Sequence, residues 1–196
     1  MRIDECTFID WQLELLAQQG VKRVVLCVGH LGEQIVQHVA TRRYGLAISV
    51  SFDGLEPIGT YGAIKNALPQ LGFVFGVLYG DVYPLYSIKA MNEAFYNSDA
   101  SALMAVHSPG QGNAHYELDG LITDFGQAGK WKYGDAGFSM FEAESFTRDR
   151  NYRDLGELCR ELALTGFLEG VPVTEPVYEI GSVAGLTRFR DYVLCR

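Results

Sequence analysis

The chain has 196 residues, 48% of them hydrophobic and 20% charged, and its formal net charge is −8 at pH 7. This length and composition predict one globular domain, and the negative charge argues against nucleic acids or anionic membranes as general partners. No run of the sequence approaches the ~20 apolar residues that span a membrane, and its start lacks a signal-peptide pattern, so we expect a cytoplasmic protein.

The four cysteines, Cys6, Cys27, Cys159 and Cys195, are scattered through the sequence. They form no CxxC pair, and no histidine lies at zinc-ligand spacing from them, so we expect free thiols. Cys27 lies inside the apolar run "VVLCV" and is predicted to be a small residue of the core.

The front half of the chain alternates between helices and strands. Apolar residues at helical spacing predict a first helix through Ile9, Leu13 and Leu16, which Thr7 or Asp4 could cap and Gly20 would end. We then expect strands at 22–28, 46–52, 73–81 and 100–108, and helices at 31–40, 62–71 and 87–98. Strands separated by helices imply right-handed crossovers, so the predicted fold class is α/β, with a doubly wound, mainly parallel, Rossmann-like sheet.

The back half is richer in strands. Asp119-Gly120 lies between two short alternating runs in 115–126 and predicts a tight hairpin. Further on we expect a strand at 137–141, a helix at 154–166, a proline-interrupted strand at 171–181 and a closing helix at 186–194. We expect this half to fold onto the same core as the front half, so that residues 1–196 form a single domain.

Two carboxylates end predicted strands, where ligands of open α/β sheets gather. Asp81 ends the strand in "VLYGDVY", and Glu179 ends a later strand in "VYEIGS". If the two strands are neighbours, both carboxylates could hold one Mg2+, with phosphate oxygens filling the remaining positions. The alternative is that Asp81 caps the helix that begins near Ser87 and that Glu179 is solvated.

A second segment, "EPIGTYGAIKNAL" (56–68), places two glycines around Thr60 and Tyr61 just before a helix. Such a segment offers close backbone approach and free amides at a helix N-terminus. No GxSxG, Walker loop or GxGxxG follows a strand, which argues against hydrolases and dinucleotide-binding enzymes.

Taken in order, these segments resemble the sugar-1-phosphate nucleotidyltransferases, which join a nucleoside triphosphate to a sugar 1-phosphate and release pyrophosphate. The matching segments are "FIDWQLELLAQQGVKRVVLCVGHLGEQI", "GTYGAIKNAL", "VLYGDVY", "GN" at 112–113, "DAGFSMF", "DLGELCRELALTGFLEGVPV" and "YEIGSVAGL". The resemblance spans nearly the whole chain and implies the nucleotide-diphospho-sugar transferase type of fold.

The resemblance also implies roles for particular residues. It makes Asp81 and Glu179 the ligands of Mg2+, and it divides the chain into a nucleotide-binding half (1–108) and a sugar-binding half (109–196). The implied contacts to the nucleotide are Gly59, Thr60, Gly62 and Gly80, and those to the sugar phosphate are Asn113, Asp135 and Gly137. The implied partners are a nucleoside triphosphate or sugar nucleotide and a sugar 1-phosphate. Tyr61 stands where the family usually has a small residue, so either the base pocket is narrowed or the ring turns outward.

The family opens with a strand, a glycine-rich loop that carries an arginine, and a proline-flanked lysine, all before the helix with which this resemblance begins. These groups stabilise the charge that builds up during transfer. We therefore expect a truncated member without this loop, impaired or inactive as an enzyme. The alternatives are a non-catalytic sugar-nucleotide-binding or regulatory module, and a fragment of a full-length enzyme.

The strand that precedes this loop is central in the family's sheet. Without it, the sheet could close up, another chain could supply a strand, or the chain could self-associate through exposed sheet edges. We expect self-association into a homo-oligomer.

Overall fold

The computed structural model describes residues 2–3, 6–54, 56–108, 110, 112–148 and 150–195. The helices are α1 (Phe8–Gln18), α2 (Gly32–Ala40), α3 (Gly59–Ala67), α4 (Ile88–Tyr96), α5 (Leu155–Leu164) and α6 (Val183–Leu194), with short 3-10 turns at Leu68–Gln70 and Ala143–Phe146. The first strands are β1 (Arg2–Ile3), β2 (Cys6–Thr7), β3 (Arg23–Val28), β4 (Ala47–Phe52), β5 (Val74–Leu78) and β6 (Val82–Pro84). The later strands are β7 (Ala102–His107), β8 (Ala114–Tyr116), β9 (Ile122–Phe125), β10 (Gly134–Glu142), β11 (Leu168–Pro172) and β12 (Val177–Glu179).

The order of helices and strands confirms the α/β prediction, although the short strands β1, β2 and β6 were not predicted and the bounds of several elements differ. The helix expected at 62–71 begins earlier, at Gly59, whose φ of +76° suits glycine, and its last turn is a 3-10 turn. The strand expected at 171–181 is two strands, β11 and β12. Pro172 and Pro176 lie where the ladder breaks, because proline cannot donate a backbone hydrogen bond.

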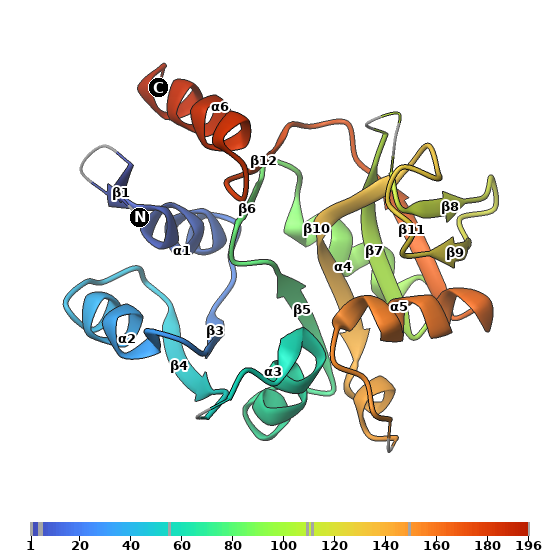
Figure 1. The fold of residues 1–196 in the computed structure, drawn as a ribbon, viewed down its shortest axis with the longest axis horizontal. Coiled ribbons are helices and arrows are strands. Elements are labelled where there is room, and N and C mark those ends of the chain that lie inside the picture. The colour runs from blue at the N-terminus through green and yellow to red at the C-terminus, as the bar shows by residue number, and fades with distance from the viewer. Residues whose placement is uncertain are drawn as a thin grey trace.

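The strands form separate ladders rather than one continuous sheet (Figure 1). The largest ladder has the order β11-β7-β10-β5, in which β11 runs parallel to β7 and β10 runs antiparallel to both of its neighbours. A second, parallel ladder joins β3 to β4, and an antiparallel pair joins β6 to β12. The predicted hairpin is the antiparallel pair β8-β9, with Gly120 at a φ of +100° in its turn.

Apolar layers cover both faces of the largest ladder. On one face, α3 and α5 bury a cluster that includes Ile64, Phe75, Phe141 and Leu158. On the other face, α1 and α4 contribute to a cluster that includes Leu16 and Met91. A third cluster joins α1 to α6, where Phe8 packs edge-on against Phe189 with ring centroids 5.0 Å apart. Among the described residues, no helix combines the length and the apolar character needed to cross a bilayer.

The strands β3 and β5 do not pair with each other. Each has a ladder partner on one side only among the described residues, β4 for β3 and β10 for β5. The sheet has therefore not closed up, and that alternative is wrong for this structure. The prediction that Cys27 lies in the core is also wrong, because its side chain in β3 is exposed.

Candidate functional site

Asp81 and Glu179 lie side by side at the β6-β12 pair. Glu179 is the register partner of Val82, and the Ile180 amide donates to the Asp81 carbonyl at 3.0 Å. A Cβ atom placed on Gly181 would lie 3.0 Å from Glu179 Oε2 and 3.3 Å from Asp81 Oδ2. The two carboxylates therefore converge on one place, which meets the condition that the strands leading to them are neighbours.

The alternative was that Asp81 caps the helix near Ser87 and that Glu179 is solvated, and the structure supports neither part of it. The cap of α4 is Ser87, whose Oγ accepts from the Ala90 amide at 3.0 Å, so Asp81 does not cap this helix. Glu179 is partly buried, and its oxygens accept from the Gly181 amide at 2.9 Å and the Ser182 hydroxyl at 2.7 Å. Glu179 is thus held in a fixed direction beside the exposed Asp81.

The carboxylates of Asp81 and Glu179 suit a cation that a bound ligand also coordinates. In the described part of the chain, no three His, Cys, Asp or Glu side chains gather in a way that could enclose a metal ion. Two convergent carboxylates are nevertheless the protein contribution that Mg2+ takes when substrate phosphates and water complete its shell. Asp81 and Glu179 therefore fit Mg2+ in a phosphate complex better than a closed structural metal site.

A buried glutamine of α1 fixes the turn that carries Asp81. Gln12 is 7% exposed, and its Nε2 donates to the carbonyls of Tyr79 at 3.0 Å and Val82 at 2.7 Å. The Val82 amide also donates to the Tyr79 carbonyl at 3.2 Å, which closes the turn. Gly80 lies inside this turn with open space around it. The orientation of Asp81 therefore depends on α1.

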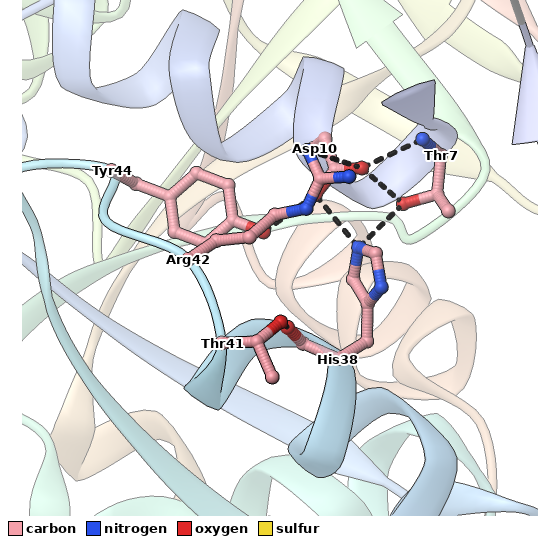
Figure 2. A network of polar contacts seen from close by, with 6 residues as sticks. All are labelled: Thr7, Asp10, His38, Thr41, Arg42 and Tyr44. Atoms are coloured by element: carbon pink, nitrogen blue, oxygen red, sulfur yellow. Dashed lines mark hydrogen bonds and ion pairs between the residues drawn. The ribbon is translucent and has the colours of Figure 1, made fainter. Parts of the chain in front are cut away.

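The helix α1 is itself anchored by a fully buried carboxylate, Asp10, two residues before Gln12. Figure 2 shows Asp10 among Thr7, His38, Arg42 and Tyr44. Its oxygens accept from the Thr7 amide at 2.7 Å and the Tyr44 hydroxyl at 2.5 Å, and lie 2.8 Å from His38 Nε2 and 3.5 Å from an Arg42 nitrogen. Burial alone would raise the pKa of Asp10, but the hydrogen bonds from Tyr44, Thr7 and His38 outweigh it and hold this pKa well below its usual range.

Asn113, Asp135 and Gly137 form a second group of predicted residues. The Asn113 Oδ1 accepts from the Asp135 amide at 3.0 Å, and Asp135 Oδ1 accepts from the Gly137 amide at 2.7 Å. Burial raises the pKa of Asp135 to about 6, although hydrogen bonds from the Gly137 amide and the Tyr79 hydroxyl oppose the shift. Gly137 has a φ of +84°, and a Cβ there would lie 2.5 Å from Val82.

Tyr79 connects this group to the carboxylate pair. Its hydroxyl interacts with Asp135 and lowers the pKa of that carboxyl, and its amide donates to the Gly137 carbonyl at 3.1 Å. Burial is the main cause of its raised pKa, and the charges of Asp135 and Asp81 add to it. The end of β5 therefore joins the predicted sugar-phosphate residues to Asp81.

The predicted nucleotide residues at the start of α3 contact a different segment. The Thr60 hydroxyl accepts from the Leu155 amide at 2.7 Å, and a Cβ on Gly59 would lie 2.2 Å from the Arg153 carbonyl oxygen. Gly62 is crowded by Ile58, at 3.0 Å from an added Cβ. These contacts lead to the beginning of α5 rather than to Asp81 or Glu179.

Tyr61 does not follow either expectation for its ring. The ring is 1% exposed and stacks on Phe146, with centroids 5.4 Å apart, while Tyr152 packs against it edge-on. It therefore turns into the core rather than outward or into a pocket.

The residues Asp10 and Gln12 were not predicted as part of the site. The spacing Thr7-x-x-Asp10 is that of a capping box, and the structure shows both of its hydrogen bonds. That signal could have identified Asp10 as a structural group. A glutamine on an otherwise apolar helix face gives no comparable signal for Gln12.

Known proteins are similar to this chain in sequence and in fold. No protein-family model matches the chain. Two curated relatives are both D-glycero-alpha-D-manno-heptose 1-phosphate guanylyltransferases. The one from Campylobacter jejuni is 35% identical over 81 residues, which are 41% of this chain and 36% of that protein. The one from Aneurinibacillus thermoaerophilus is 30% identical over 105 residues, 53% of this chain and 45% of that protein. The matched part of the chain spans less than half the length of either relative.

Solved structures match over nearly the whole chain. HddC from Yersinia pseudotuberculosis superposes with a TM-score of 0.86 at 19% identity, covering 98% of this chain and 88% of that chain. A UDP-glucose pyrophosphorylase complexed with UDP-glucose gives a TM-score of 0.77 at 14% identity, covering 100% of this chain and 90% of that chain. At such identities the likeness shows the fold, and the curated relatives add the sequence relationship. The chain is therefore a relative of the sugar-1-phosphate nucleotidyltransferases in both sequence and fold.

Proposed function

We propose that this chain carries a nucleotidyltransferase-like site at the place where Asp81 and Glu179 meet. The reaction joins a nucleoside triphosphate to a sugar 1-phosphate: a phosphate oxygen of the sugar attacks the α-phosphorus, and pyrophosphate leaves. The observation that supports this most is the convergence of the two carboxylates beside Gly181.

The carboxylate pair would hold Mg2+ together with phosphate oxygens of the ligand. Bound there, the ion supplies charge neutralisation for phosphates that a chain of net charge −8 otherwise repels. The chain's own residues orient the pair: Ser182 and the Gly181 amide hold Glu179, and Gln12 holds the turn of Asp81.

The ligand groups divide between the two halves of one domain in this proposal. Residues 1–108 take the nucleotide and residues 109–196 take the sugar phosphate. The proposed nucleotide contacts are Gly59, Thr60, Gly62 and Gly80, and the proposed sugar-phosphate contacts are Asn113, Asp135 and Gly137. The link from Asp135 through Tyr79 to the Asp81 turn supports the placement of the sugar phosphate.

The curated relatives suggest the first substrates to test. Both are named as guanylyltransferases of a heptose 1-phosphate, and HddC was also solved as a complex with GMP-PN. We therefore propose GTP and a D-glycero-D-manno-heptose 1-phosphate as the first pair.

A second candidate function is a sugar-nucleotide-binding or regulatory module without turnover. Such a module would bind the same ligands at Asp81 and Glu179 through Mg2+ and would release no pyrophosphate.

Pyrophosphate release and calorimetric GTP binding, measured with Mg2+ on the same preparation, distinguish the two candidates. The first predicts release that falls about a hundredfold or more in Asp81→Asn. The matched control is Asp99→Asn, an exposed aspartate between α4 and β7, which leaves release unchanged. Binding without release supports the module, and the absence of both contradicts both candidates.

We also propose that the chain self-associates through exposed sheet edges. In the described part of the chain, β3 and β5 each have a ladder partner on one side only, so their free edges can pair with a second copy. Sedimentation velocity at increasing protein concentration is expected to show a dimer. A single monomeric species at all concentrations would contradict this proposal.

A further inference from the structure

Asp53 lies at the carboxyl end of the parallel ladder that β3 and β4 form. It directly follows β4, and its amide donates to the carbonyl of Val28, the last residue of β3, at 2.9 Å. Its side chain is partly buried. A Cβ atom placed on Gly29 would lie 2.9 Å from Asp53 Oδ2, so a side chain at this position would displace the carboxylate. The Asp53 carboxylate therefore extends over the backbone of Gly29, across the ends of both strands.

This carboxylate lies on the face of the ladder that α3 covers. Cys27 Sγ, in β3, lies 3.7 Å from the Ala63 carbonyl of α3. Gly29 comes two residues after Cys27, and alternate residues of an extended chain share a face. Shortly after Asp53 the chain enters α3 at Gly59, where we propose contacts to the nucleotide. Asp53 is thus on the same face as α3, at the strand ends where ligands of open α/β sheets bind.

The carboxylate of Asp53 also lacks compensation for its charge. Burial raises the pKa of Asp53, and in the described part of the chain no hydrogen bond or ion pair to its carboxylate offsets this rise. The partly buried carboxylates of Asp135 and Glu179, by contrast, each accept from a backbone amide. A partly buried polar group without a partner carries a cost in free energy that a ligand with matching donors removes. Both oxygens of Asp53 can therefore accept from a ligand.

A carboxylate that only accepts hydrogen bonds favours a ligand edge with two adjacent donors. Guanine has such an edge, because its N1–H lies beside the N2 amino group. Adenine and cytosine have a ring-nitrogen acceptor beside their amino group, and uracil has a carbonyl oxygen on each side of its N3–H. Each of these bases would place an acceptor against one carboxylate oxygen. Among these four bases, only guanine therefore fits both oxygens of Asp53.

We propose that Asp53 determines the base specificity of the nucleotide site and selects guanine, by accepting from N1–H and from the N2 amino group. This inference rests on the proposed function, in which the phosphates of the same nucleotide bind with Mg2+ at Asp81 and Glu179. It adds a side chain that distinguishes one base from another to the glycine and threonine contacts proposed at the start of α3.

A change of base preference tests this proposal, because Asp53→Asn replaces one acceptor of the pair by a donor. Xanthine keeps N1–H but has a carbonyl oxygen in place of the N2 amino group, so it complements asparagine rather than aspartate. Calorimetry with Mn2+ present compares the binding of GTP, XTP, UTP and 2′-deoxy-GTP to the unmodified chain, to Asp53→Asn and to the exposed control Asp99→Asn. A general loss of structure would weaken the binding of every nucleotide and would not produce a new preference.

We expect the unmodified chain and Asp99→Asn to bind GTP about tenfold or more tightly than XTP or UTP, and Asp53→Asn to prefer XTP to GTP by a similar factor. Equal affinities for all bases in the unmodified chain, or no preference for XTP in Asp53→Asn, would overturn the proposal and leave the metal site intact. If Asp53→Asn instead removes a preference for GTP over 2′-deoxy-GTP, the carboxylate holds the ribose and the proposal is also overturned. Binding of none of these nucleotides would contradict the proposed function together with this inference.

Discussion

Asp10 illustrates how much of the site depends on a residue outside it. Its fully buried carboxylate holds α1 in place through Thr7, His38 and Tyr44, and α1 in turn carries Gln12 to the Asp81 turn. The charge of Asp10 also raises the pKa of Arg42. A buried charge with several partners is costly to disturb, because its partners then lose their compensation.

We predict that Asp10→Asn lowers the free energy of unfolding by about 2–4 kcal/mol at pH 7. Because the folded state depresses the pKa of Asp10, its stabilising contribution is present above its ordinary pKa of 3.8 and is lost as the pH falls toward the folded value. Urea unfolding between pH 7 and pH 3 should therefore show the two proteins converging in acid. Asp99→Asn is the exposed control, and a constant difference at every pH would contradict the prediction.

The effect of Asp135 on the free energy of unfolding depends on pH in the opposite direction to that of Asp10. Its pKa rises from 3.8 to about 6 on folding, so its ionised form opposes folding above pH 6 and has no such effect below pH 4. We predict that Asp135→Asn raises the free energy of unfolding by about 2 kcal/mol at pH 8 and leaves it nearly unchanged at pH 4. Thermal unfolding at both values checks this. A loss of stability at pH 8 would mean that the hydrogen bonds to the Gly137 amide and the Tyr79 hydroxyl outweigh burial.

Gln12 provides a test of positioning at the site. Gln12→Leu leaves the Tyr79 and Val82 carbonyls without this donor, so we expect a loss of about 1–2 kcal/mol in stability and weaker binding of Mn2+ in the presence of GTP. Gln18→Leu is the matched control, because it changes an exposed residue of the same helix. Calorimetry and urea unfolding measure the two effects. Unchanged Mn2+ affinity in folded Gln12→Leu would contradict a role in positioning Asp81.

At the scale of secondary-structure elements, the backbone conformation of strand β10 requires glycine at position 137. Gly137 lies at an irregularity of the β10-β7 register with a φ of +84°, and it packs directly against Val82 of β6. We predict that Gly137→Ala lowers the free energy of unfolding by about 2–4 kcal/mol. Gly80→Ala is the control, with open space at its Cβ and an ordinary φ, and is expected to change stability by less than about 1 kcal/mol. Equal effects in a denaturant titration would contradict this reading.

Most of these helices and strands were predicted correctly, because the apolar periodicity and the turn residues that specify them lie within or next to each element in the sequence. Apolar periodicity placed α1 and α2, and Asp119-Gly120 identified the β8-β9 hairpin. The ends of the strands identified Asp81 and Glu179 as candidate ligands, but the sequence alone left open whether their strands are neighbours. The start of α3 was placed too late, because its first turn is held by a segment almost a hundred residues away in sequence. The Tyr61 amide donates to the Arg153 carbonyl at 3.1 Å, and the Thr60 hydroxyl accepts from the Leu155 amide.

The incorrect predictions at individual residues also have a tertiary cause, since they depend on contacts between segments that are far apart in the sequence. Cys27 was expected in the core because its strand is apolar, yet its side chain is exposed on the side of β3 that faces Ala63 of α3. Tyr61 was expected either to narrow the base pocket or to turn its ring outward, but the ring packs in the core against Phe146 and Tyr152 from distant segments. The contacts of Gln12 join residues that are far apart in the chain, so no local pattern could predict them.

At the scale of the whole molecule, two groups of strands are held apart and in place by α1 and α3 (Figure 1). The carboxylate pair lies where the antiparallel strands β6 and β12 meet, and the turn that bears Asp81 follows β5.

The most direct test of the proposed function is calorimetric titration of Mn2+ into the chain with GTP present. We predict one site per chain, with affinity reduced about tenfold or more in both Asp81→Asn and Glu179→Gln and unchanged in Asp99→Asn. Equal Mn2+ affinity in all four proteins, or no binding to the unmodified chain, would contradict a shared metal and nucleotide site at these two carboxylates.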